Sequence, residues 1–116
     1  MSRDLRLYLD DIVDARINIV EYASTTSRED FLTGGMAFDA IVRNLEIIGE
    51  AVKHLPDEFR NANQQVDWRK IAGLRDLLAH AYFGLDPLTL WGIVEEKIPA
   101  LLEQVRDVRS RIEGTD

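Results

Sequence analysis

The chain has 116 residues, of which 46% are hydrophobic and 30% are charged, with a formal net charge of -7. This balance is typical of one globular domain and excludes a disordered chain, while no apolar run is long enough to span a bilayer. Disulfide and thiolate chemistry are excluded because there is no cysteine, and the N-terminal acids disfavour a signal peptide, so we expect a single cytoplasmic domain over residues 1–116 without membrane contact.

The first half of the chain shows two long helical patterns. Apolar side chains recur every three or four residues over residues 4–23, which predicts a first amphipathic helix. Ser27 followed by Asp30 is a helix-start signal, so a short extra helical turn is expected before the next two glycines. The helical pattern returns over residues 36–55 and stops at Pro56, which predicts the second helix.

A polar connection precedes the third helical pattern. Residues 56–66 are interpreted as a loop that could contain a helical turn around Phe59. Asp67 is a good N-cap, and apolar side chains follow it at helical spacing as far as Leu78. A third helix is therefore expected to begin after Asp67 and to carry the residues discussed below.

The last helical pattern covers residues 87–112. Pro87 suits the first turn of a helix, whereas Pro99 removes one backbone hydrogen bond from the interior, so a kink is expected between Glu95 and Pro99. Nothing in the sequence resembles a strand. Four main helices with short connections predict an all-α, up-and-down four-helix bundle.

The segment LRDLLAHAY brings a fixed cation, an imidazole and a phenol into nine residues. On a helix, Arg75 and Tyr82 would share one face because they are two turns apart. Asp76 and His80 would lie on an adjacent column, four residues apart. Arg75 could clamp a phosphate, and His80 near a helix C-terminus could transfer a proton near neutral pH. This pair suits phosphodiester cleavage by the neighbouring ribose hydroxyl.

The same spacing also fits a solvated helix face with an ion pair between Asp76 and His80, which is the commoner use of such residues. Residues 60–80 carry a local formal charge of +2 on an acidic chain, so a small basic site is possible although a general nucleic-acid coat is not expected. Spacing alone leaves both interpretations open.

Arg75-x4-His80-x-Tyr82, in the form RDLLAHAYFGLD, resembles the signature of the HepT toxins of the HEPN superfamily. The stretch VRNLEIIGEA over residues 42–51 is similar to the family's second-helix pattern, and the two tryptophans fall where members commonly carry aromatic residues. The resemblance extends from the first helix to about residue 110. It implies a HEPN-like bundle.

The resemblance also implies a metal-independent endoribonuclease that needs no cofactor and acts as the toxin of a type VII toxin–antitoxin pair. Two protomers would form a homodimer in which Arg75 and His80 of each chain face one RNA cleft. The family's antitoxin is a minimal nucleotidyltransferase, MntA, which transfers AMP from ATP to the motif tyrosine. Tyr82 matches that position, and AMP there would place negative charge in the cleft. The homodimer could join a higher assembly with the antitoxin.

Three further residues are assigned supporting roles. Asp76 stands where the family commonly has Asn or another polar residue, Glu50 is expected to line or brace the cleft, and Asn44 could contact RNA. Glu46, Glu50 and His54 form one helical column that could ligate a metal, but no matching pair from another helix is visible, so no metal site is expected. The alternatives are a catalytically silent helical partner of a nucleotidyltransferase and a small metal-binding bundle.

Overall fold

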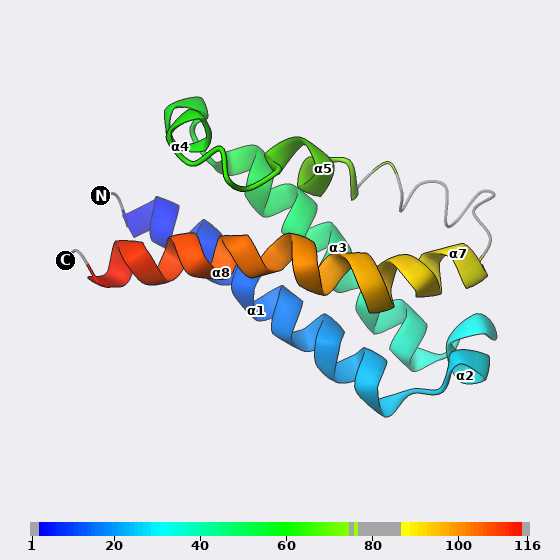
Figure 1. Cartoon of the computed structure of the whole chain (residues 1–116). Helices are drawn as coiled ribbons and strands as arrows, with labels where there is room; N and C mark the ends of the chain where they lie inside the picture. The colour runs from blue at the N-terminus through cyan, green and yellow to red at the C-terminus, as the bar shows by residue number, and fades with distance from the viewer. Residues whose placement is uncertain (1–2, 75, 77–86, 115–116) are drawn as a thin grey trace.

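The computed structural model describes residues 3–74, 76 and 87–114. Three long helical rods lie along one another in Figure 1, and α1 packs against both α3 and α8. No strand occurs in the described ranges, so the predicted all-α bundle is confirmed. The elements, in chain order, are α1 (Arg3–Thr25), α2 (Arg28–Leu32), α3 (Met36–His54), α4 (Asp57–Ala62), α5 (Trp68–Ala72), α7 (Pro87–Gly92), the π-helix η1 (Ile93–Lys97) and α8 (Ile98–Gly114).

The first two predicted helices and the extra turn between them are confirmed as α1, α3 and α2. Ser27 caps α2, because its hydroxyl oxygen accepts the backbone N–H of Asp30 at 3.1 Å. Gly34 then adopts a φ of 76°, a left-handed conformation that favours glycine, and the chain turns into α3. Leu55 is extended, as expected before Pro56, and ends α3.

The connection after α3, predicted as a loop, is partly helical. The turn predicted around Phe59 is the helix α4. Asp67 is the N-cap of α5, as predicted, and its carboxylate accepts the backbone N–H of Lys70 at 3.1 Å. The prediction of an uninterrupted third helix is wrong, because α5 ends at Ala72 and Gly73 forms its C-cap. Glycine is a poor residue for a helix interior because it lacks a side chain and retains backbone freedom.

The C-terminal rod deviates from α-helix where Pro99 predicts a disturbance. The disturbance is a π-helical turn, η1, in which the N–H of Ile98 donates to the carbonyl of Ile93, five residues earlier. In a regular α-helix the Pro99 ring would clash with the carbonyl four residues before it, and the wider π turn relieves that clash. In Figure 1, α7 and α8 continue as one nearly straight rod, so the expected kink takes the form of a π turn.

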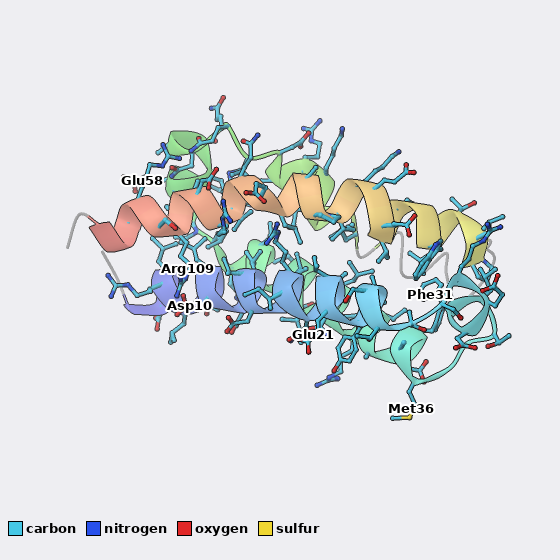
Figure 2. The ribbon with its side chains drawn as sticks, turned by 60° about the horizontal axis from the view of Figure 1, so that its bottom comes forward. Asp10, Glu21, Phe31, Met36, Glu58 and Arg109 are labelled. Carbon is cyan, nitrogen blue, oxygen red and sulfur yellow. The ribbon has the colours of Figure 1, made fainter. Side chains whose placement is uncertain are left out.

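Apolar side chains from all three rods form the core, and ion pairs join α1 to α8 at its edge. A guanidinium nitrogen of Arg16 lies 2.7 Å from a carboxylate oxygen of Glu103. Arg109 pairs with Asp10, and these two side chains face each other between the two helices in Figure 2. None of the described helices is both long enough and apolar enough to cross a membrane. The largest fully buried side chains include Leu9, Ile12, Phe31, Leu45, Ile48, Leu90 and Leu102.

Candidate functional site

The three motif residues Arg75, His80 and Tyr82 lie outside the described residues, so their predicted arrangement stays a prediction. The start of the motif is described. Leu74 is helical and only 5% exposed, whereas Asp76 is helical and exposed. The buried Leu74 therefore anchors the chain immediately before Arg75, and the Asp76 carboxylate is accessible to solvent.

The segment that leads into the motif is held firmly by α5. Ile71 is fully buried, and α5 packs against α3. The indole N–H of Trp68 donates to the backbone carbonyl of Asn63 at 3.0 Å, and its ring lies 6.0 Å from that of Phe59. Trp68 is thus a core residue that joins α4 to α5.

Asn44 occupies a polar position between α1 and α3 inside the core. Asn44 is only 8% exposed, and its side-chain amide nitrogen donates to the backbone carbonyl of Ala40 at 2.8 Å. Its amide oxygen accepts from the Asn18 side chain at 3.2 Å. These two hydrogen bonds satisfy the amide oxygen and the amide nitrogen of Asn44, which would otherwise be buried without partners. Asn18 was not identified from the sequence, because nothing local marks a partner 26 residues away.

Glu50 lies at a groove between α1 and α3. Its carboxylate is 4.0 Å from the imidazole of His54, and the His54 ring stacks on Tyr8 with centroids 5.1 Å apart. Glu46 lines the same groove and is exposed, as is His54. The groove has a volume of about 350 Å³.

The metal-binding alternative receives no support from this column. Within the ranges that the structure describes, no group of three or more His, Asp and Glu side chains is placed to hold a metal ion. Glu50 and His54 form a close pair, but a bundle metal site requires further ligands from facing helices.

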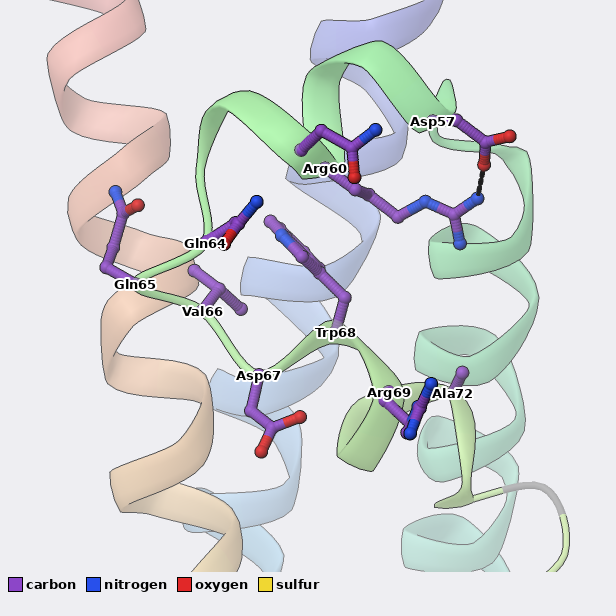
Figure 3. Close-up of a pocket in the computed structure, with 10 residues that line it drawn as sticks. Asp57, Arg60, Gln64, Gln65, Val66, Asp67, Trp68, Arg69 and Ala72 are labelled. Carbon is purple, nitrogen blue, oxygen red and sulfur yellow. Dashed lines mark hydrogen bonds and ion pairs between the residues drawn. The ribbon is translucent and has the colours of Figure 1, made fainter.

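A wider polar cleft lies between α4 and α5, on the segment that leads into the motif. Figure 3 shows its side chains around Trp68, with Arg60 paired to Asp57 and Arg69 farther along α5, beside Ala72. The volume of this α4–α5 cleft is about 900 Å³. The sequence signal for this cleft is the amide-rich run within residues 56–66, which by itself predicts only a polar connection. The cleft is lined by Asp57, Arg60, Asn61, Gln64, Gln65, Val66, Asp67, Trp68, Arg69 and Ala72.

A second groove follows the π-helix. It joins the end of α5 to η1 and the start of α8, and its volume is about 690 Å³. Leu74 and Ile98 provide apolar surface, with Lys70, Glu96 and Lys97 also lining it. The motif segment thus starts between the polar α4–α5 cleft and the more apolar groove at η1.

Comparison with known proteins identifies the family. The model of the HepT-like ribonuclease family matches residues 12–108. A Methanocaldococcus jannaschii protein named "Putative RNase" is 38% identical over 115 residues, covering 99% of this chain and 95% of that protein. "Probable ribonuclease HepT" of Thermococcus cleftensis is 41% identical over 109 residues, covering 94% and 99%.

A third relative, a "Putative RNase" of Caldanaerobacter subterraneus subsp. tengcongensis, is 43% identical over 103 residues, covering 89% of this chain and 92% of that protein. No solved structure matches the chain significantly. The family match extends from α1 into α8 and includes the whole segment from Arg75 to Tyr82. On this evidence the chain belongs to the HepT-like ribonuclease family.

Proposed function

We propose that this chain is a metal-independent endoribonuclease that acts in the cytoplasm as the toxin of a type VII toxin–antitoxin pair. The observation that carries the proposal is the family match over residues 12–108, which includes the Arg75, His80 and Tyr82 motif. The relatives named as ribonucleases cover nearly the whole chain and support the same activity. The proposed active form is a homodimer, because a single Arg and His provide only half of the groups that the cleavage step uses.

In the proposed mechanism, the ribose 2′-hydroxyl attacks the adjacent phosphorus. A bond forms between phosphorus and O2′, and the bond between phosphorus and O5′ breaks, leaving a 2′,3′-cyclic phosphate and a 5′-hydroxyl. One His80 accepts the proton of the 2′-hydroxyl, and the second, from the other protomer, gives a proton to O5′. The Arg75 guanidinium groups stabilise the negative charge that develops on the phosphoryl oxygens.

Control of this activity is proposed to occur at Tyr82. The Tyr82 oxygen would attack the α-phosphorus of ATP on an MntA-like nucleotidyltransferase, forming a phosphodiester bond while pyrophosphate leaves. The attached AMP would bring a negative phosphate next to the residues that bind RNA, and like charges repel. AMP transfer to the wild type but not to a Tyr82→Phe variant, measured as added mass, tests this step. Equal added mass on both chains would remove Tyr82 from this role.

A second candidate function is a catalytically silent partner subunit of the nucleotidyltransferase. The observation that favours it is the exposed carboxylate of Asp76, next to Arg75 in the sequence, since an anion there opposes the approach of RNA phosphate. In this case Arg75→Ala and His80→Ala would bind the nucleotidyltransferase as the wild type does, and none of the three proteins would cleave RNA.

Three proteins separate these functions: wild type, Arg75→Ala and His80→Ala. We expect the wild type to arrest growth on expression and to cleave RNA in the presence of EDTA, and both variants to do neither. Circular dichroism provides the control that all three are folded. RNA cleavage at equal rates by the three folded proteins would overturn the assignment of Arg75 and His80.

A further inference from the structure

We propose that the α4–α5 cleft binds a short single-stranded segment of RNA beside the bond that is cleaved. Arg69 would contact one phosphate, and the side-chain amides of Asn61, Gln64 and Gln65 would contact base edges. The proposal rests on the proposed ribonuclease function and deepens it, because it assigns a substrate-selecting surface outside the Arg75 and His80 motif.

The backbone that carries these side chains is held in one arrangement. The carbonyl of Asn63 accepts hydrogen bonds from the Trp68 indole at 3.0 Å and from the Val66 backbone at 3.3 Å. The Asn63 side chain donates in turn to the carbonyl of Phe59 at 2.9 Å. Trp68 is 8% exposed, so its ring forms the floor of the cleft and is not available as a stacking surface. A fixed loop lowers the ordering entropy that binding would otherwise require.

The polar side chains at the end of α4 and on this fixed loop face solvent. Asn61, Gln64 and Gln65 are exposed, and within the described part of the chain their side chains form no hydrogen bond. A side-chain amide offers one acceptor and two donors, which matches the edges of an unpaired base. Sequence-specific RNA recognition acts mainly on single-stranded bases whose edges are open to such contacts. The amides therefore suit a strand whose bases are unpaired.

The charges in the cleft allow one phosphate contact and not a long backbone track. Arg60 is paired with Asp57, and the Asp67 carboxylate caps α5. Arg69 is exposed and forms no ion pair with any residue that the structure describes, so its guanidinium can bind a phosphate through two hydrogen bonds. The two carboxylates disfavour further phosphates nearby.

The cleft is close to the motif by covalent geometry. Ala72 lines the cleft, ends α5 and precedes Arg75 by three residues. Three residues span at most about 11 Å even when fully extended. The cleft edge and the Arg75 backbone therefore lie within the reach of a few nucleotides of one strand.

The test measures RNA binding without cleavage, in full-length chains that all carry His80→Ala. The probe is a fluorescent single-stranded oligoribonucleotide of about twelve nucleotides, within the usual range of single-strand sites. We expect Arg69→Gln to weaken binding about tenfold and to reduce the slope of log affinity against log salt by about 0.7, the value for one lost phosphate contact. The matched control is Arg28→Gln, an exposed arginine on α2 at the other end of the molecule, which should bind as the parent does.

Two further measurements locate the effect. A dinucleotide that fills only the cleavage position should bind Arg69→Gln as well as it binds the parent. Gln64→Ala combined with Gln65→Ala should reduce the difference in affinity between oligonucleotides of different base sequence, with the salt slope retained.

Equal binding of the longer probe by the Arg69→Gln chain and its parent would overturn the proposed cleft. The proposed cleft would also be overturned if Arg69→Gln weakened binding of the dinucleotide as much as binding of the longer probe, since Arg69 would then act at the cleavage position. Failure of the ribonuclease function gives a different result: the wild type would neither cleave nor bind RNA, whereas failure of the cleft alone leaves cleavage by the wild type and its loss in Arg75→Ala intact.

Discussion

The scaffold of α1, α3 and α8 differs from the α4–α5 segment in how its polar groups are used. In the scaffold, several of them bind partners on another helix: Arg109 pairs with Asp10, and Asn44 bonds to Asn18. In the α4–α5 segment, hydrogen bonds fix the backbone, while side chains such as Gln64 and Arg69 face solvent. The scaffold thus uses polar pairs within the fold, whereas α4 and α5 expose polar side chains on the segment that leads into the motif.

The largest effect on stability should come from the scaffold core. Leu45 on α3 is fully buried, so Leu45→Ala would leave a cavity and lower the free energy of unfolding by about 3 kcal/mol. Urea unfolding measures this change. A loss below about 1 kcal/mol would contradict the view that α3 is the centre of a tightly packed core.

The polar bridge between α1 and α3 should have a smaller effect. Asn44→Ala removes the partner of the Asn18 amide and one bond to the helix backbone, so we expect a loss of about 1–2 kcal/mol in the free energy of unfolding. Comparison of RNA cleavage rates at a temperature where both proteins are folded separates this structural role from the predicted RNA contact. A cleavage defect in the fully folded variant would support the RNA contact as well.

Two matched N-caps compare the regions directly. Ser27→Ala removes the acceptor of the Asp30 N–H in α2, and Asp67→Ala removes the acceptor of the Lys70 N–H in α5. Each substitution should lower the free energy of unfolding by about 1 kcal/mol. Only Asp67→Ala should also lower RNA cleavage, because α5 leads into the motif. Equal cleavage by the two variants, assayed when fully folded, would remove the proposed link between α5 and the site.

The smallest effect on stability is expected in the α4–α5 cleft. Gln64 is exposed, so Gln64→Ala should change the free energy of unfolding by less than about 0.5 kcal/mol. Chemical denaturation gives this value. A loss as large as that of Asn44→Ala would mean that Gln64 serves the fold, and the contrast between the two regions would fail.

Local signals predicted much of the fold correctly. Ser27 and Asp67 cap helices because their side chains bond to N–H groups three residues on, a relation that the sequence contains directly. Pro99 likewise marked the position of the irregular turn. Its π-helical form was not predicted, because a proline in a helix can be accommodated by a bend or by a wider turn, and the surrounding packing selects between them.

The candidate site depended more on relations that the sequence does not contain. The bond between Asn18 and Asn44 and the grouping of Gln64 with Arg69 arise from packing between separate elements, so periodicity could not reveal them. Gly73 ended α5 although the apolar pattern continues through Leu74. Residue identity alone marks the motif, and the roles of Arg75, His80 and Tyr82 remain predictions.

The product of RNA cleavage tests the central claim most directly. Purified wild-type protein is incubated with a defined RNA in EDTA, and the ends of the fragments are identified by mass spectrometry. The proposed mechanism predicts cleavage with 2′,3′-cyclic phosphate and 5′-hydroxyl ends, and no cleavage by His80→Ala. Cleavage that requires a divalent metal and leaves a 3′-hydroxyl and a 5′-phosphate would contradict it.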